Sequence, residues 1–380
     1  MTKLVPLVIA AAIILLSCRN EGKSRTGGTG VDSPAIPQGR LFIERIQGAT
    51  RVEVREPWQN SGGRELVWYL VGRDSTLPPG IDEEQVIRVP VRRMVCMSTT
   101  HAAMMRALEA DSLIVGISGS SLVYDSILLE RIRSGGIKDV GYEGNLNREL
   151  VISLEPDLVM AYGVADPSSG SNARLAEAGV KVFYNADYLE QHPLTRCAWL
   201  RLFGLLTGKE RMADSIVSAV SESYYTLVSM AAGAEGDKPG VLLGAPWEDV
   251  WYVSPGNTYI GRLIEDAGGH YIFSDMTGSN SVPVSVESVF RRASDAEIWI
   301  NPGTADMLSD IALSDHRMTS LSLFRGGRIW NNRGRIRPEG GNDYWESGVV
   351  RPDLLLKDFI SIIHPELLPD HDQYYYIRLE

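Results

Sequence analysis

Residues 94–101 read MVCMSTTH, and this stretch, with the helical pattern over 102–110, decides the fold class. Its first half is a short apolar run typical of a buried strand, and its second half places hydroxyl side chains directly before a helix. Strand–helix alternation of this kind indicates a parallel sheet covered by helices. The alternation continues with strand patterns at 113–117, 157–161 and 180–184 and a helical pattern at 173–178.

A second α/β pattern follows a long helical stretch. Leu194 to Ala232 has apolar residues at helical spacing with a local break at Thr207-Gly208, and Lys238-Pro239-Gly240 ends it. We therefore predict an α/β fold of two lobes, each with a Rossmann-like parallel sheet, joined by one long interlobe helix. In the second lobe, strand patterns lie at 241–243, 298–300 and 328–330, and helical patterns at 259–267 and 352–363.

The region before the first lobe has the pattern of a β-hairpin. Two β-rich segments, 51–54 and 66–71, are separated by the turn sequence NSGG at 60–63. A further short strand pattern lies at 86–91. These segments predict an N-terminal β-hairpin extension of the first lobe.

The first residues have the pattern of an export signal. Lys3 precedes an apolar run at 4–16, which is shorter than the roughly 20 residues of a membrane span. The sequence LLSC at 15–18 then resembles the bacterial lipobox, which implies cleavage before Cys18 and lipid attachment to its thiol. A simple secretory signal with an incidental cysteine is the alternative. We expect a bacterial envelope protein, held by lipid on Cys18 at the periplasmic side of a membrane.

The segment after Cys18 is rich in Gly, Ser, Thr and Pro, which is typical of a flexible tether. The predicted segments are a lipoprotein signal peptide at 1–17, the tether at 18–39, an N-terminal lobe with the hairpin extension at 40–190, the interlobe helix at 191–236 and a C-terminal lobe at 237–380.

Composition and charge exclude some functions. The formal net charge is −11 and no basic stripe interrupts the sequence, so nucleic acid is a poor partner. The six histidines are scattered without metal-ligand spacing, so we predict no metal site and no resident cofactor. Cys96 and Cys197 lie in a strand and a helix far apart in sequence, and we expect buried free thiols rather than a disulfide. We also expect a monomer.

Five groups of motifs lie along the chain after residue 85. They are VPVRRMV at 89–95 with STTH at 98–101, NREL at 147–150 with LEPDLV at 154–159, FGLLTGKE at 203–210, DAGG at 266–269 and VSVE at 284–287. Together they resemble one known family, the iron-chelate and cobalamin periplasmic binding proteins of ABC transporters. The resemblance covers nearly everything after residue 85 and implies two rigid lobes with a ligand cleft between them. The closing segment, GGNDYWE at 340–346 to HPE at 364–366, is similar to a variant of the family with an N-terminal hairpin extension.

Ligands of open α/β sheets bind at the carboxyl ends of the strands, which gives a set of candidate residues. The hydroxyl groups of Ser98, Thr99 and Thr100 have helix capping as an equal alternative. Aromatic residues suit a large flat ligand, and core packing or a surface position is the alternative for them. The candidates in the first lobe are Ser98, Thr99, Thr100, Tyr142 and Tyr162, and those in the second are Trp247, Tyr259, Asn301, Asn331, Asn332 and Trp345.

Three arginines, Arg333, Arg335 and Arg337, alternate in one predicted loop. A guanidinium group can bind two oxygens of a carboxylate, catecholate or phosphate at once, so these arginines would clamp an anionic chelate. A solvated loop is the alternative. His101 or a tyrosine is a weaker candidate, as a ligand of haem iron.

Glu149 and Glu287 stand at matching motif positions of the two lobes. The resemblance implies that each begins a helix and pairs with arginines on one of the two permease subunits. A carboxylate that only interacts favourably with its helix dipole is the alternative.

The sequence therefore predicts a binding lipoprotein of an ABC importer rather than an enzyme. It lacks a nucleophile-elbow motif, a P-loop and a Rossmann fingerprint. A surface scaffold is the third possibility, although a scaffold needs no cleft between two lobes. We expect the ligand to be a siderophore-type ferric chelate, with cobalamin or haem as the alternative.

Overall fold

The first lobe is built on a parallel five-stranded sheet. The computed structural model describes residues 35–163 and 170–380, so the predicted signal peptide, Cys18 and most of the predicted tether lie outside the described residues. The strand order is β7-β6-β5-β8-β9, and all four pairings are parallel. The strands are β5 (Met94–Cys96), β6 (Ile114–Ile117), β7 (Lys138–Asp139), β8 (Leu158–Ala161) and β9 (Val182–Tyr184).

Apolar runs form these strands because helices cover the sheet and leave its central strands buried. The predicted strands at 94–97, 113–117, 157–161 and 180–184 are thereby confirmed, each within two residues. The helices of this lobe are α1 (Thr99–Ala107), α2 (Ser126–Arg133), α3 (Arg148–Ser153) and α4 (Ser171–Glu177).

The second lobe has a five-stranded sheet of order β13-β10-β15-β16-β17, in which only β17 is antiparallel to its neighbour. A small antiparallel sheet of order β11-β12-β14 lies in the same half of the chain. The strands are β10 (Gly240–Leu243), β11 (Pro246–Trp247), β12 (Val250–Val253), β13 (His270–Tyr271), β14 (Val282–Ser285), β15 (Ile298–Ile300), β16 (Ile329–Asn331) and β17 (Ile377–Arg378). The helices are α8 (Tyr259–Asp266), α9 (Val286–Arg292), α10 (Leu308–Ser314), α11 (Ser322–Gly326), α12 (Asp343–Glu346) and α13 (Pro352–Ile363).

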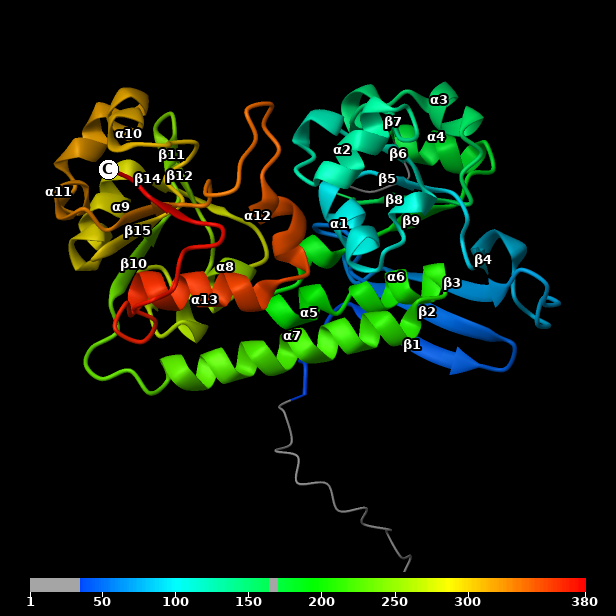
Figure 1. Cartoon of the computed structure of the whole chain (residues 1–380), viewed down its shortest axis with the longest axis horizontal. Coiled ribbons are helices and arrows are strands. Elements are labelled where there is room, and N and C mark those ends of the chain that lie inside the picture. The colour runs from blue at the N-terminus through cyan, green and yellow to red at the C-terminus, as the bar shows by residue number, and fades with distance from the viewer. Residues whose placement is uncertain (1–34, 164–169) are drawn as a thin grey trace, which may run out of the picture. The chain divides into compact units, whose positions relative to one another are not determined.

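The long interlobe helix is α7 (Glu210–Ala231), but the stretch from Leu194 to Ala232 is not one helix. Two shorter helices, α5 (Pro193–Cys197) and α6 (Leu200–Thr207), precede α7, and the chain reverses at Gly208 so that α6 packs against α7 (Figure 1). Gly208 ends α6 in the left-handed conformation, with a φ of +72°, which favours glycine. Gly204 permits the close approach, since a Cβ there would lie 2.7 Å from that of Ala213. Helices α5 and α13 also contact α7.

The N-terminal extension is a four-stranded sheet rather than a two-stranded hairpin. The predicted hairpin forms β2 (Ala49–Arg55) and β3 (Glu65–Gly72), which pair antiparallel. The prediction missed β1 (Leu41–Ile46), whose apolar residues do not alternate cleanly and whose side chains are mostly exposed or half-buried. The predicted strand at 86–91 is β4 (Val86–Val89), which adds to β3 in parallel.

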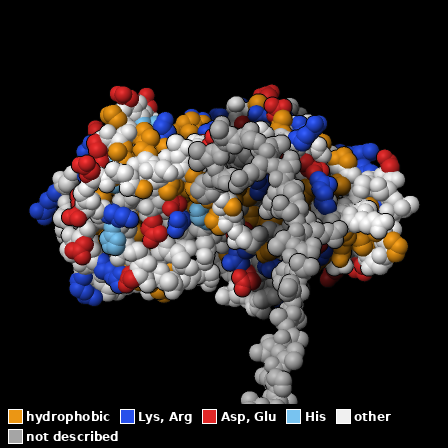
Figure 2. All heavy atoms as spheres, turned by 90° about the horizontal axis from the view of Figure 1, so that it is seen from below, with side chains coloured by type: hydrophobic (Ala, Val, Ile, Leu, Met, Phe, Trp, Pro, Cys, Tyr) orange, Lys and Arg blue, Asp and Glu red, His pale blue; other side chains and the backbone are white. Residues whose placement is uncertain are grey.

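The described surface carries charges of both signs. Figure 2 shows Lys and Arg side chains interspersed with Asp and Glu on the face seen, without a continuous basic stripe among the residues drawn in colour. Within the described ranges, no helix is long and apolar enough to span a membrane. Cys96 and Cys197 are buried free thiols, and burial raises the pKa of both, that of Cys197 to about 12.

Candidate functional site

A cavity of about 610 Å³ opens at the carboxyl ends of second-lobe strands. Leu243 at the end of β10, Asn301 after β15 and Asn332 after β16 form part of its wall. The segment 188–191, which follows the last strand of the first lobe, contributes to the opposite side. Both its position and its volume are typical of a small-molecule site.

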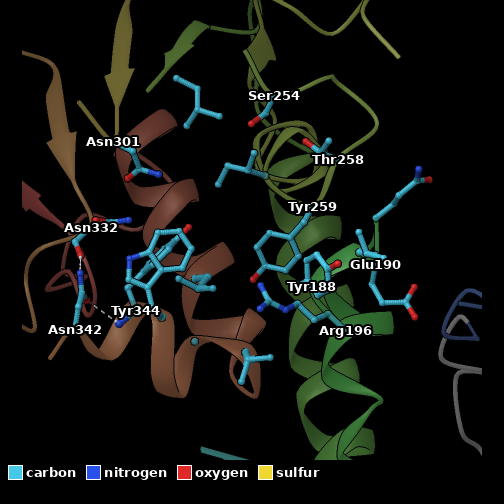
Figure 3. A pocket seen from close by; sticks show the side chains of 18 of the residues that line it. Tyr188, Glu190, Arg196, Ser254, Thr258, Tyr259, Asn301, Asn332, Asn342 and Tyr344 are labelled. Atoms are coloured by element: carbon cyan, nitrogen blue, oxygen red, sulfur yellow. Dashed lines mark hydrogen bonds between the residues drawn. The ribbon is translucent and has the colours of Figure 1, made fainter. Parts of the chain in front are cut away.

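Aromatic side chains face each other across the cavity. Tyr259, the first residue of α8, lies on one wall with Arg196 of α5, and Tyr344 of α12 lies on the other (Figure 3). The ring of Trp345 packs edge-to-face on Tyr344 with 4.7 Å between centroids, and 56% of Trp345 remains exposed. Burial raises the pKa of Tyr259 and of Tyr344, so both phenols stay protonated at neutral pH. These walls suit a planar or ring-bearing ligand.

Arg196 brings a positive charge to the cavity wall. Its Nε donates to Asp187 Oδ2 at 2.9 Å, and its guanidinium lies 5.4 Å from the centroid of the Tyr259 ring. The side chain of Arg196 is only 16% exposed and that of Asp187 is 2% exposed. Asp187 therefore both compensates the buried charge and fixes the orientation of the guanidinium.

Two further charged side chains line the cavity, and both already have partners. Arg333 forms a two-pronged ion pair with Asp306, in which Nη2 lies 2.9 Å from Oδ2. Glu190 accepts from the indole of Trp199 and the backbone N–H of Arg40, each at 2.9 Å, and burial raises the pKa of Glu190. Its carboxylate points away from the gap between Tyr259 and Tyr344 (Figure 3).

Asparagines brace the loops that follow the strands. Asn342 Nδ2 donates to the carbonyl of Asn332 at 2.9 Å, and Asn342 Oδ1 accepts from the N–H of Tyr344 at 3.0 Å. Asn301 has a left-handed backbone with a φ of +57°, and its buried Oδ1 has no hydrogen-bond partner among the described residues. Strain combined with an unpaired polar atom at a cavity wall is typical of a binding position.

Of the fourteen candidate ligand contacts, the structure brings together five at this cavity, namely Tyr259, Asn301, Asn332, Arg333 and Trp345. Ser98 caps α1, accepting from the N–H of Thr100 at 3.2 Å, so the capping interpretation is confirmed. Thr99 and Thr100 are the first residues of α1, and these three residues do not line the cavity. Tyr142 and Trp247 are 59% and 72% exposed, and Tyr162 is half-buried, all away from the cavity wall. Their contact with a ligand stays a prediction.

Arg335 and Arg337 do not line the cavity either, and both bind other parts of the protein. Arg335 Nε donates to Asp343 at 2.6 Å, and Arg337 Nε donates to the carbonyl of Tyr124 in the first lobe, also at 2.6 Å. Both guanidinium groups lie over the ring of Tyr124. In this geometry the arginine loop ties the two lobes together, and its contact with a ligand stays a prediction.

Glu346 belongs to the same interlobe contact. Its carboxylate accepts from the backbone N–H of Tyr124 at 2.7 Å and of Asp125 at 2.9 Å. The side chain is buried, and burial raises its pKa to about 7. The cavity wall at Asn342, Tyr344 and Trp345 thus continues directly into a contact with the first lobe.

The main residue that the sequence prediction missed is Arg196. It stands in the sequence PLTRCAWL at 193–200, where every neighbour is apolar or small. A lone arginine inside a buried helical segment signals a buried ion pair, but the sequence gives no indication that Asp187 is its partner.

Glu149 and Glu287 are both exposed in the first turn of a helix, as predicted. Asn147 caps α3 and Ser285 caps α9. Neither glutamate has an ion-pair partner within the part of the chain that the structure describes. Their carboxylates are thus available to an external partner, and docking stays a prediction.

His101 is fully buried, and its two ring nitrogens have no hydrogen-bond partner among residues 35–163 and 170–380. Burial lowers its pKa to about 4, so the ring is neutral at physiological pH. It lies beside Phe203 and does not line the cavity. Over the same ranges, no group of three or more His, Cys, Asp or Glu side chains is placed to hold a metal ion.

Comparison with known proteins gives one consistent result. A family model described as "Periplasmic binding protein" matches residues 94–321. An uncharacterized lipoprotein of Methanocaldococcus jannaschii is 26% identical over 325 residues, which cover 82% of this chain and 75% of that protein. A cobalamin-binding protein of Halobacterium salinarum is 27% identical over 226 residues, 58% of this chain and 56% of that protein.

The fold of the chain is also similar to that of solved periplasmic binding proteins. A solved structure of a possible iron-binding, periplasmic solute-binding protein from Staphylococcus epidermidis has a TM-score of 0.54 at 20% identity, covering 72% of this chain and 99% of that one. At this identity the likeness concerns the fold alone.

Proposed function

Because this chain belongs to the periplasmic binding protein family, we propose that it captures a siderophore-type ferric chelate and delivers it to the permease of an ABC importer. The proposed role is transport and not catalysis. Binding proteins of this kind need two lobes and a ligand site that opens to solvent.

The cavity beside α5, α8 and α12 is the observation that carries the proposal. It combines aromatic walls at Tyr259, Tyr344 and Trp345 with a few oriented polar groups. Such walls give a large contact area with little loss of side-chain entropy, as a bulky chelate requires. Arg196 would supply the positive charge that the sequence predicts at Arg333, Arg335 and Arg337.

Cobalamin is the alternative ligand, and haem is a further one of the same kind. The observation that favours cobalamin is the name of the Halobacterium relative, which aligns with little more than half of this chain. The volume of the cavity, about 610 Å³, favours a more compact chelate or one bulky portion of a larger ligand.

Anchoring and docking complete the proposal. Lipid on Cys18 would hold the protein at the membrane, and a relative described as a lipoprotein supports this. Glu149 and Glu287 would pair with arginines of the two permease subunits, because both are exposed and unpaired within the described ranges.

Tryptophan fluorescence tests the ligand. The chain, purified without its leader, is titrated with ferric siderophores and with cyanocobalamin. We expect a ferric chelate to quench the emission with sub-micromolar affinity, because Trp345 lines the cavity. Trp345→Phe should lose most of that quenching, whereas the matched control Trp68→Phe, in β3 of the N-terminal extension and outside the cavity, should keep it.

The outcomes separate the candidates. Saturable binding of cobalamin without any response to ferric chelates would transfer the function to the alternative. No response to any of these ligands would contradict the proposal.

A further inference from the structure

We infer that Arg196 is the anion-binding residue of the cavity and that the captured chelate presents a free carboxylate to it. The inference rests on the proposed function and narrows its ligand class. It favours ferric chelates with carboxylate groups over neutral ferric hydroxamates and over cobalamin.

The first argument is that the described part of the protein uses only one of the three guanidinium nitrogens of Arg196. Arg196 has five N–H donors, and its one hydrogen bond to a described residue uses Nε. Nη1 and Nη2 have no acceptor among the described side chains or backbone carbonyls, and the residue lies in the cavity wall. A carboxylate accepts two parallel N–H bonds from such an edge, which a single neutral oxygen does not.

The second argument is that the guanidinium is oriented before a ligand arrives. Asp187 holds its Nε at 2.9 Å, and the Tyr259 ring lies within cation–π distance of it. Its side chain is only 16% exposed. Ligand binding therefore costs little side-chain entropy at Arg196, because that side chain is already held in place. The charge that the ligand meets is also screened only weakly by water.

The third argument is a comparison with the other arginine of the wall. Arg333 already gives both Nε and Nη2 to Asp306, so two of its three nitrogens are engaged within the protein. The two arginines line one cavity, but Arg196 keeps both Nη groups without a partner among the described residues, whereas Arg333 keeps only Nη1. The pair Arg333–Asp306 is therefore a natural internal control.

The remaining polar groups fit the same ligand. The phenol of Tyr259, on the same wall as Arg196, stays protonated and can donate to a carboxylate oxygen there. Asn301 lies on the wall opposite Arg196 (Figure 3), and its amide side chain adds a polar group to that wall. The cavity thus presents hydrogen-bond donors at the wall of Arg196 and further polar groups at the opposite wall.

The test compares two double variants. Arg196→Gln with Asp187→Asn removes both buried charges, so that no carboxylate is left uncompensated. Arg333→Gln with Asp306→Asn removes the matched pair. Affinities for ferric citrate and for a neutral ferric trihydroxamate are measured by titration calorimetry for the wild-type chain and both variants.

We expect the wild-type chain to prefer ferric citrate. The Arg196–Asp187 variant should lose roughly ten- to hundredfold in affinity for ferric citrate, the range of hydrogen bonds to charged groups, with little change for the hydroxamate. Unchanged hydroxamate binding also reports that the variant is folded. The Arg333–Asp306 variant should keep both affinities within about twofold, because Arg333 already gives two of its nitrogens to Asp306.

The contrary results are distinct. Equal loss in both double variants, or no loss in either, would overturn the role of Arg196 and leave the proposed function standing. Preference for the hydroxamate would overturn the ligand class alone. If the wild-type chain binds neither ferric chelate, the proposed function fails as well, whether or not cobalamin binds.

Discussion

Glu346 should make the stability of the protein depend on pH in a way that one substitution removes. The residue is only 2% exposed, and its carboxyl group accepts from two backbone N–H groups of the first lobe. Burial, with Asp125 and Asp343 close by, raises its pKa from the ordinary 4.5 to about 7. The folded protein therefore holds this proton more tightly than the unfolded chain does.

The sign and size of the effect follow from this difference. Between pH 4.5 and about 7 unfolding releases the proton of Glu346, so this group's contribution to stability falls as pH rises through that range. One pKa unit corresponds to about 1.36 kcal/mol, so the full shift corresponds to about 3 kcal/mol. The contribution is present below the unfolded pKa and is lost once pH exceeds the folded one.

Glu346→Gln keeps the shape of the protonated acid and removes the titration. The free energy of unfolding is measured by urea denaturation at pH 4.5 and pH 8. The value for the variant minus that for the wild-type protein should be higher at pH 8 than at pH 4.5, by up to about 3 kcal/mol. Glu339→Gln, an exposed position in the preceding loop, should gain nothing. A difference between Glu346→Gln and wild type that is the same at both pH values would refute this reasoning.

Three other changes have definite expected results. Cys18→Ser should release the protein from membranes because its lipid site is lost, and membrane fractionation would contradict this if the variant still sediments with membranes. Glu149→Arg or Glu287→Arg should abolish uptake of the ligand in cells and leave its dissociation constant unchanged, since the change is confined to an exposed helix start. Loss of ligand binding in either variant would assign that residue to the ligand site instead. Gly204→Val should lower the free energy of unfolding by about 1–3 kcal/mol, because its side chain meets Ala213 where α6 crosses α7, and an unchanged urea midpoint would contradict that packing argument.

The sequence predicted the lobes well because parallel strands are buried on both faces and appear as short apolar runs. The strand at Ile298–Ile300 and the helix at Pro352–Ile363 have the predicted bounds. Local sequence patterns failed to predict elements whose formation depends on tertiary contacts. Strand β1 is recognisable only once β2 is there to pair with it, and its exposed side chains give little periodicity.

The interlobe stretch shows the same limit. Its apolar spacing was compatible with one helix, and the break at Thr207-Gly208 was visible in the sequence. Whether a break bends a helix or reverses the chain depends on what packs across it. Here Gly204 lets α6 lie directly on α7, which a periodicity argument does not reveal.

The candidate site was predicted in part for a related reason. The rule that ligands lie at the carboxyl ends of strands correctly indicated Asn301, Asn332 and Tyr259 as cavity residues. It gave no way to know that Arg335 would bind Asp343 or that Arg337 would reach the first lobe. Nor did it give the pairing of Arg196 with Asp187, since those contacts join segments whose approach depends on the whole fold.

Equilibrium dialysis with radiolabelled ferric chelates and radiolabelled cobalamin tests the central claim most directly. The account predicts that the purified chain retains one ferric chelate per molecule and that Trp345→Ala, which removes a wall of the cavity, weakens retention. Cobalamin should be retained weakly or not at all. Failure to retain any ferric chelate, or retention that Trp345→Ala leaves unchanged, would contradict the assignment of this cavity as the site of an iron-chelate binding protein.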